Sequence, residues 1–158
     1  MTYGLNPAQL RQFVIDPSLK TIGLYSRVAS DLVLGTAMHE SMLQYLHQLR
    51  SSPALGLWQM EPATHDDCWT NFLQYHPGLA TDVSSLSGGK HSPDLLIGNL
   101  YYASAMCRVR YFRSSESLPA TSYPLLLAQY WKSIYNTPQG AGTVQQALQQ
   151  FADAVNTQ

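Results

Sequence analysis

The sequence is poor in charge, and the charges that it has are balanced. Charged residues make up 12% of the 158 residues, and the formal net charge is −1. Soluble domains usually carry about 25% charged residues. A nucleic-acid-binding domain normally shows a basic excess, so this balance argues against a nucleic-acid partner.

Cysteines and long hydrophobic runs are scarce too. Cys68 and Cys107 are not in metal-ligand spacing, so we expect buried thiols, and sequence leaves a disulfide open. No run approaches the roughly 18 apolar residues of a membrane span, so stable membrane insertion is not expected. Residues 1–6 lack a basic region and no apolar stretch follows them, so no signal peptide is predicted.

Apolar and aromatic residues are abundant instead. Hydrophobic residues make up 45% of the chain, which contains 10 Tyr and 3 Trp. A chain of this length is expected to form one domain, residues 1–158, with a proper core. A near-neutral, aromatic-rich protein suits an uncharged amphipathic ligand such as a sugar chain, although aromatic residues mostly fill cores.

Local signals predict an all-α domain of about six helices. Asn-Pro and Asp-Pro pairs mark two helix starts, a Thr-x-x-Gln capping box marks the last, and no alternating run indicates a strand. Residues 81–91 are rich in Ser and Gly and predict a loop. The expected helices cover about residues 7–14, 16–50, 64–75, 92–112, 122–135 and 143–155.

The long central helix, residues 16–50, carries the most informative residue. Glu40 is the only formally charged side chain between Leu32 and Leu49. It lies about half a turn away from the Arg27–Asp31 pair, which we expect on the solvated side. A carboxyl group on the less polar face is desolvated, stays protonated and can donate a proton, although most helical carboxylates are solvated or paired. Gly35 disfavours the helix by ~1 kcal/mol, which a close helix crossing would explain better than substrate access.

The residues after this helix form a recognisable pattern. Glu40-Ser41 on a helix is followed, after a break, by Gly-Leu-Trp-Gln-Met-Glu-Pro-Ala-Thr at residues 56–64. This order resembles the lytic transglycosylases and the related goose-type lysozymes. Residues 94–102 and 134–140 resemble two further blocks of that family, the second in a departed form. The resemblance covers roughly residues 28–148 and implies a lysozyme-like fold with Glu40 as the single catalytic acid.

The resemblance also implies a reaction. Such enzymes cleave the β-1,4 bond between N-acetylmuramic acid and N-acetylglucosamine in peptidoglycan glycan strands. Glu40 would protonate the leaving oxygen, the 2-acetamido group would assist, and ionised Glu40 would deprotonate the 6-hydroxyl to give a 1,6-anhydro product. Some relatives hydrolyse the bond instead, so a hydrolytic lysozyme stays an alternative. No cofactor or metal is implied.

The resemblance assigns the substrate-binding residues as well. Ser41 would hydrogen-bond the glycan, Gln59 would position the sugar, and Met60 would pack in the groove. Tyr135, with Asn136 beside it, matches the tyrosine near the catalytic Glu. Tyr130 is the rival for that role. Without the resemblance, the simpler structural interpretation is that Ser41 is an ordinary helix residue, Gln59 caps a turn and Met60 belongs to the core.

Other polar residues have simpler interpretations. Asp66 and Asp67 are expected in the first turn of a helix, where the dipole favours anions, rather than as a second catalytic acid. Three arginines, 108, 110 and 113, are expected in a solvated helix end, with contact to acidic peptide stems as the alternative. His39 and His47 lack a third ligand for a metal site.

The small size and the departed motif fit a bacteriophage enzyme. It would reside in the host cytoplasm or the virion, with other virion proteins as partners, and would act on the cell wall. Two alternatives stay open: a structural or glycan-binding virion protein without turnover, and a helical nucleic-acid-binding virion protein, which the charge balance disfavours.

Overall fold

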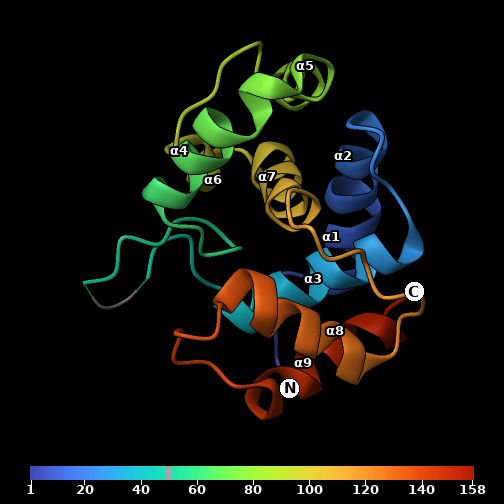
Figure 1. Ribbon diagram of the computed structural model, residues 1–158. Coiled ribbons are helices and arrows are strands. Elements are labelled where there is room, and N and C mark those ends of the chain that lie inside the picture. Colours follow the sequence, from blue (N-terminus) through green and yellow to red (C-terminus); the bar gives the residue numbers. More distant parts are fainter. Residues whose placement is uncertain (49–50) are drawn as a thin grey trace.

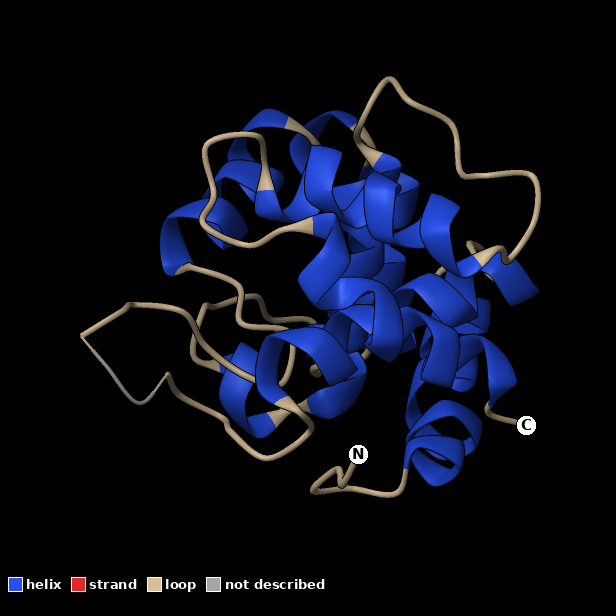
Figure 2. Ribbon diagram, turned by 90° about the horizontal axis from the view of Figure 1, so that it is seen from below, coloured by secondary structure: helices blue, strands red, loops and turns tan. Residues whose placement is uncertain are grey.

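The computed structural model describes residues 1–48 and 51–158, and helices are the regular secondary structure of this part of the chain (Figure 1). Figure 2 shows helices joined by loops throughout these ranges. The strand-like pairings in them are isolated bridges, between His47 and Leu55 and between Leu55 and Met60. The all-α prediction is therefore confirmed, and the helices form one compact domain.

The N-terminal part is divided differently from the prediction. Helix α1 (Pro7–Leu10), the π-helical turn η1 (Arg11–Ile15) and α2 (Asp16–Thr21) follow one another without a break. Proline lacks an N–H and its ring crowds the carbonyl four residues earlier, so the wider π turn before Pro17 fits it into the helix. The chain then turns at Gly23, and Ser26 caps α3 (Arg27–Ser41). The predicted helix 16–50 is therefore wrong: it is two helices.

Helix α3 also ends earlier than predicted. Met42 and Leu43 adopt left-handed φ angles of 53° and 55°. Their carbonyls accept hydrogen bonds from the backbone N–H groups of Gly4 and Leu5, at 3.0 and 3.2 Å. The apolar periodicity continues past this point, but Leu46 is half-exposed in a loop. Glu40 therefore lies in the last turn of its helix, and the predicted end at Arg50 falls outside the described residues.

The remaining helices follow the predictions more closely. The predicted loop at 81–91 is wrong in its first part, because a helix that was not predicted, α5 (Pro77–Ser85), occupies it. The helix expected at 92–112 is interrupted at Asn99, whose side chain caps α7 (Leu100–Phe112). The Thr143–Gln146 capping box is confirmed. No helix in the described part is long and apolar enough to cross a bilayer. The elements are α4 (Pro62–Asn71), η2 (Leu73–Tyr75), α5 (Pro77–Ser85), α6 (Leu95–Gly98), α7 (Leu100–Phe112), α8 (Pro124–Tyr130), η3 (Trp131–Asn136) and α9 (Val144–Asn156).

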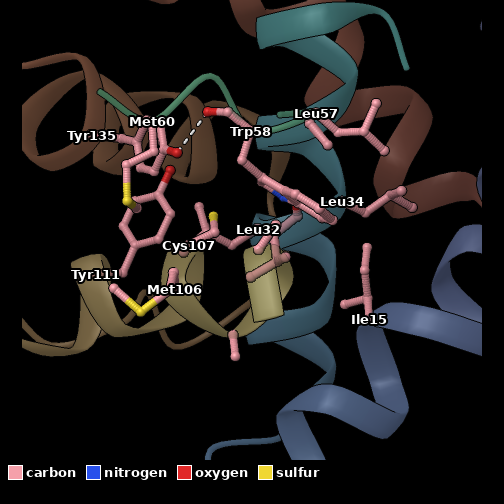
Figure 3. Packing of buried hydrophobic residues seen from close by; sticks show 14 of the residues in the cluster. Ile15, Leu32, Leu34, Leu57, Trp58, Met60, Met106, Cys107, Tyr111 and Tyr135 are labelled. Carbon is pink, nitrogen blue, oxygen red and sulfur yellow. Dashed lines mark hydrogen bonds between the residues drawn. The ribbon is translucent and has the colours of Figure 1, made fainter. Parts of the chain in front are cut away.

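The core lies where α3 packs against α7 and α9 (Figures 1 and 3). A Cβ atom on Gly35 would overlap the Phe151 ring of α9, so the predicted close helix crossing is confirmed. Trp58, from the loop after α3, is buried and donates its indole N–H to the Val33 carbonyl at 2.9 Å. Cys68 and Cys107 are free buried thiols, as expected.

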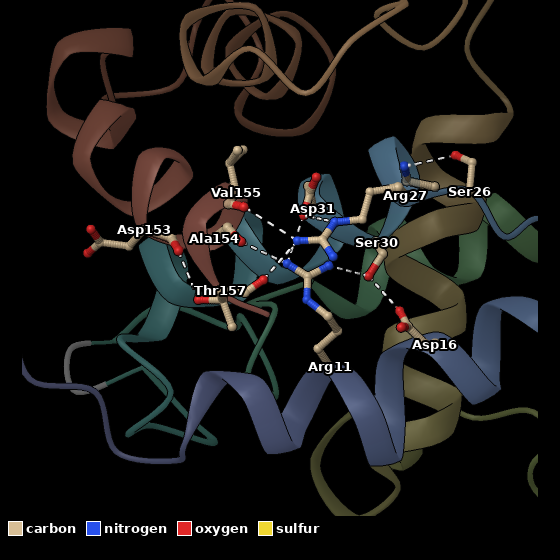
Figure 4. A network of polar contacts seen from close by, with 11 residues as sticks. Arg11, Asp16, Ser26, Arg27, Ser30, Asp31, Asp153, Ala154, Val155 and Thr157 are labelled. Carbon is tan, nitrogen blue, oxygen red and sulfur yellow. Dashed lines mark hydrogen bonds and ion pairs between the residues drawn. The ribbon is translucent and has the colours of Figure 1, made fainter.

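A buried ion pair ties the ends of the chain to α3 (Figure 4). Arg11 Nη2 donates to Asp31 Oδ1 and to the Ala154 carbonyl, both at 2.7 Å. Half-exposed Arg27 binds the same carboxylate oxygen at 3.0 Å. Asp31 itself is fully buried. The expectation of a solvated Asp31 is wrong, because a local pattern does not show which distant cation a carboxylate will meet.

Candidate functional site

Glu40 lies on the wall of a pocket of about 520 Å³. Ligand-binding pockets commonly measure about 300–1,000 Å³, so this one has room for a small ligand or a sugar unit. Its lining comes from the end of α3, the loop before α4, α7, and the connection between η3 and α9. The lining residues are Glu40, Gln48, Ser52, Ala54, Gln59, Glu61, Thr64, Arg110, Tyr135, Asn136, Thr137, Gly140 and Ala141.

The Glu40 carboxyl group is held by an indole. Trp131 Nε1 donates a hydrogen bond to Glu40 Oε1 at 2.9 Å. Burial raises the pKa of Glu40 from 4.5 to about 7, while the Trp131 hydrogen bond and the charge of Arg110 act in the opposite direction. Burial prevails because removing a carboxylate from water disfavours its charged form. Glu40 can therefore carry a proton near neutral pH, as predicted for a general acid.

Gln59 reaches the pocket from a tight turn. The backbone N–H groups of Leu55 and Met60 donate to each other's carbonyl oxygens, at 2.9 and 3.1 Å, and close the turn. Gly56 has a φ of +76°, and a Cβ there would overlap the Leu96 carbonyl oxygen, so the position requires glycine. Gln59 caps the turn by donating Nε2 to the Gly56 carbonyl at 2.8 Å, and it also lines the pocket. The geometry of Gln59 therefore fits both interpretations, a residue that caps a turn and a residue that could contact a ligand in the pocket.

The backbone is strained at two positions on the pocket wall. Gln59 has a φ of 49°, and Thr137 has a φ of 72° with a ψ of 156°. Non-glycine residues rarely occupy these regions, at a cost of about 1–3 kcal/mol each, and such residues cluster at binding and catalytic sites. Met42 and Leu43 also have positive φ angles but do not line the pocket, so two of the four such residues in the described chain belong to the pocket lining.

Tyr135, rather than Tyr130, belongs to this pocket. Its ring lines the pocket, and the Arg110 guanidinium lies 4.4 Å from the ring centroid. Its hydroxyl donates to the Trp58 carbonyl at 2.6 Å, as Figure 3 shows, so it holds the turn before Gln59 rather than Glu40 itself. The Tyr130 hydroxyl donates instead to the Glu116 carbonyl at 2.8 Å, and Tyr130 lines other hollows.

Asn136 also lines the pocket, and its side-chain oxygen already accepts a hydrogen bond. Lys132 Nζ donates to Asn136 Oδ1 at 2.7 Å and to the Gly140 carbonyl at 2.8 Å. These two bonds fix the connection between η3 and α9 beside Glu40. Four of the predicted residues, Glu40, Gln59, Tyr135 and Asn136, thus line the same pocket.

The structure places the other two predicted residues elsewhere. The Ser41 hydroxyl donates to the Ala37 carbonyl of its own helix and accepts from the Leu43 N–H. Met60 is buried beside Tyr111 (Figure 3). Neither residue lines the pocket, so their geometry fits the simpler structural interpretations: Ser41 is the last residue of a helix, and Met60 belongs to the core.

Sequence reasoning missed Trp131, which binds Glu40, and two residues of the pocket lining, Arg110 and Glu61. Trp131 was visible only as a neighbour of Tyr130, and nothing local connects it with Glu40 across 91 positions. Arg110 belongs to an arginine cluster that was expected to be solvated. That expectation is wrong for Arg108, which is buried, and for Arg110, which donates to the Tyr135 carbonyl. Glu61 was read only as part of the motif, yet it brings a second carboxylate to the pocket.

Asp66 and Asp67 do not line this pocket. Helix α4 begins at Pro62, so both lie in its second turn and the first-turn prediction is wrong. Asp66 Oδ1 bonds His65 Nδ1 at 2.9 Å. Asp67 pairs with Arg113, and the hydrogen bonds from Asn71 and from Arg113 lower the pKa of its carboxyl group. Their interpretation as structural rather than catalytic acids fits this arrangement.

The histidines near Glu40 have structural contacts. His39 packs edge-on against the Trp131 ring, 4.6 Å between centroids, and its Nδ1 lies 3.2 Å from the side-chain amide of Gln150. His47 is exposed and bonds the Gln48 carbonyl. Within residues 1–48 and 51–158, no group of three His, Cys, Asp or Glu side chains could hold a metal ion.

Comparison with known proteins identifies no relative. No family model, curated protein or solved structure matches the chain. The resemblance to lytic transglycosylases therefore stays a prediction. The function has to be inferred from the geometry and chemistry of the Glu40 pocket.

Proposed function

We propose that this protein cleaves the glycan strands of peptidoglycan, with Glu40 as the proton donor. The observation that carries the proposal is the position of Glu40, a carboxyl group whose pKa burial raises to about 7, on the wall of a pocket large enough for a sugar unit. A glycosidic bond breaks when its leaving oxygen receives a proton and the oxocarbenium-like centre is stabilised. The polar lining offers amide, hydroxyl and guanidinium donors to an uncharged, hydroxyl-rich ligand.

The first step transfers the Glu40 proton to the leaving glycosidic oxygen. The bond between that oxygen and the anomeric carbon breaks, and Glu40 becomes a carboxylate. The Trp131 indole N–H, 2.9 Å from Glu40 Oε1, stabilises this charged form. The neighbouring positive charge of Arg110 acts in the same direction.

The second step returns a proton to Glu40. The 2-acetamido group of N-acetylmuramic acid assists at the anomeric carbon, and Glu40 then takes the proton of the 6-hydroxyl. The 6-oxygen displaces the acetamido oxygen from the anomeric carbon, which restores the acetamido group and gives a 1,6-anhydro product without consuming water. A single carboxyl group serves both steps, because its pKa near 7 lets it donate and accept a proton at the same pH.

Hydrolysis is the second candidate, and Glu61 favours it. Its exposed side chain lines the same pocket as Glu40. Glycosidases that work with two carboxyl groups use the second one to activate a water molecule or to form a covalent intermediate. A Glu61 carboxylate acting on water would yield a reducing-end sugar instead of an anhydro sugar.

Mass spectrometry of digested peptidoglycan tests both candidates. Purified peptidoglycan incubated with the protein is expected to release 1,6-anhydro muropeptides, and Glu61→Gln is expected to leave that product unchanged. Reducing-end products that disappear in Glu61→Gln would establish the hydrolytic candidate. Intact glycan strands after prolonged incubation would contradict both, and would favour a glycan-binding or structural protein.

A further inference from the structure

A second hollow, of about 310 Å³, lies apart from the Glu40 pocket. Among the described residues the two share no lining residue. Tyr111 stacks on Tyr135 of the Glu40 pocket, at 5.3 Å, and on Tyr130 of the second hollow, at 5.5 Å. An aromatic stack thus separates the two, and the proton chemistry of Glu40 makes no use of the second hollow.

Arg108 lines this hollow with a buried charge. The residue is only 6% exposed, and its Nε donates to the Leu24 carbonyl at 3.2 Å. Its Nη1 is buried without a hydrogen-bond partner, and no carboxylate in the described part of the chain pairs with it. Burial lowers the pKa of the guanidinium. A buried cation without a counter-charge is strongly unfavourable in a folded protein, unless a ligand supplies the missing charge.

A serine-rich segment forms the facing wall. Ser114, Ser115 and Ser117 line the hollow. The segment is held in place because the Ser114 hydroxyl accepts from the Glu116 N–H at 3.1 Å and the Glu116 carbonyl accepts from Tyr130. The Glu116 carboxylate also belongs to this rim, and its Oε1 accepts from Ser133, a residue of the neighbouring hollow, at 3.3 Å. Serine hydroxyls can donate to an anion that the guanidinium attracts.

We propose that this hollow binds an oxyanion, a carboxylate or a phosphate group, between Arg108 and the serine segment 114–117. A guanidinium N–H group forms a charge-assisted hydrogen bond with such a group. Because Nε already donates to the Leu24 carbonyl and Nη1 is buried, Nη2 is the nitrogen left to meet the anion. The walls formed by Tyr111, Phe112 and Tyr130 leave room for an apolar part behind the anion. The bound anion supplies a negative charge to Arg108, which no carboxylate of the described chain pairs with. This site is independent of the peptidoglycan proposal.

Nuclear magnetic resonance of the full-length, ¹⁵N-labelled chain tests the site. Acetate and inorganic phosphate are titrated in separate arms at constant ionic strength, with chloride as the balancing ion. Saturable shifts are expected at the Arg108 Nε–H and at the amides of residues 114–118, in the arm whose anion fits. Arg108→Met is expected to weaken that binding at least about tenfold, the loss typical of a charge-assisted pair.

Arg113→Met is the matched control. It removes one positive charge near the same helix end, but Arg113 pairs with Asp67 and does not line the hollow. The affinity for the anion should stay unchanged in this variant. Shifts that never saturate in either arm, or that saturate equally in Arg108→Met, would overturn the proposal. Should circular dichroism show that Arg108→Met is unfolded, wild-type shifts mapping away from residues 108 and 114–118 would overturn it instead.

Discussion

At the scale of single residues, the behaviour of Glu40 depends on two opposed influences. Burial favours its neutral form, whereas the Trp131 N–H favours its carboxylate. An acid that must donate a proton and then take one back needs both influences in balance. Trp131 is therefore a positioning residue: it aims the carboxyl group at the pocket and limits the rise of its pKa.

Trp131→Phe should shift the pH dependence of cleavage. Without the N–H, the charged form of Glu40 loses its donor, so its pKa rises further above 7 and the alkaline fall of kcat/KM moves to higher pH. A fall of about tenfold in kcat is also expected, because hydrogen bonds to charged groups contribute about 1.5–3 kcal/mol. The measurement is the pH profile of muropeptide release.

Trp69→Phe is the control for this experiment. Its indole donates to the Tyr102 hydroxyl at 2.9 Å, away from Glu40, so the pH profile should be that of the wild type. A profile of Trp131→Phe that keeps its wild-type midpoint while its activity falls would show that Trp131 only fills space.

Glu40 should also make stability depend on pH. Between about pH 4.5 and 7, the folded protein holds a proton that the unfolded chain releases, so the free energy of unfolding falls as pH rises through this window. Glu40→Gln removes this dependence. Urea unfolding should show the variant more stable than wild type by about 3–4 kcal/mol at pH 8, from ~1.4 kcal/mol per pKa unit, and equal to it at pH 4. A difference that does not change with pH would contradict the raised pKa.

At the scale of elements, local signals predicted where helices begin better than where they end. The capping box at Thr143 predicted the start of α9 correctly, because the cap and its partner lie three residues apart in the sequence. The end of α3 was missed because it depends on residues 4 and 5 bonding the carbonyls of Met42 and Leu43. Long-range pairing of this kind leaves no local periodicity, and the apolar pattern simply continued.

The site followed the same division. The turn at residues 56–60 and the pocket positions of Glu40, Gln59, Tyr135 and Asn136 agree with the motif-based prediction. Trp131, Arg110 and Glu61 were missed, because they meet around Glu40 or its pocket only when η3, α7 and the start of α4 pack near the end of α3. Ser41 and Met60 match the motif in residue type only. The Ser41 hydroxyl bonds its own helix at the early end of α3, and Met60 is buried in the core, so neither lines the pocket.

The crossing of α3 and α9 should tolerate no side chain at position 35. Gly35→Ala gains about 1 kcal/mol of helix propensity but forces a Cβ into the Phe151 ring, and overpacking costs typically 1–3 kcal/mol. A net loss of stability is therefore expected, measured by urea unfolding. Gly78→Ala, in α5 with open space around the new Cβ, should be neutral or slightly stabilising. Equal effects of the two substitutions would contradict the close crossing.

At the scale of the whole molecule, Arg11 joins three distant parts of the chain. Its guanidinium reaches Ser30 and Asp31 of α3 and the Ala154 carbonyl of α9 (Figure 4). The same α3 carries Glu40 at its other end, and α9 follows the connection that holds Asn136 and Thr137 at the pocket. The contacts of Arg11 with Ser30, Asp31 and Ala154 therefore hold α3 and α9 together, and with them the two segments that line the pocket on either side of Glu40.

Removing Arg11 should cost far more than removing Arg27. Arg11→Met leaves buried Asp31 short of its inner partner, and breaking a buried pair typically costs about 3–5 kcal/mol. At roughly 2–4 °C per kcal/mol for a chain of this size, Tm should fall by about 10 °C in a calorimetric scan. Arg27→Met removes the half-exposed partner of Asp31, so it should lower the free energy of unfolding by about 1 kcal/mol or less. Equal losses in the two variants would show that Asp31 does not depend on the buried pair.

The central claim is that Glu40 supplies the proton that breaks the glycan strand, and Glu40→Gln tests it most directly. The substitution keeps the size of the side chain and an oxygen that can accept the Trp131 hydrogen bond, but it removes the acidic proton. The measurement is the initial rate of muropeptide release from purified peptidoglycan, by mass spectrometry, with circular dichroism confirming the fold. General acid catalysis contributes about 10²–10⁴-fold, so the variant should lose at least 99% of the rate. A folded Glu40→Gln that retained more than about a tenth of the wild-type rate would contradict the assignment, because that loss is far below the general-acid range.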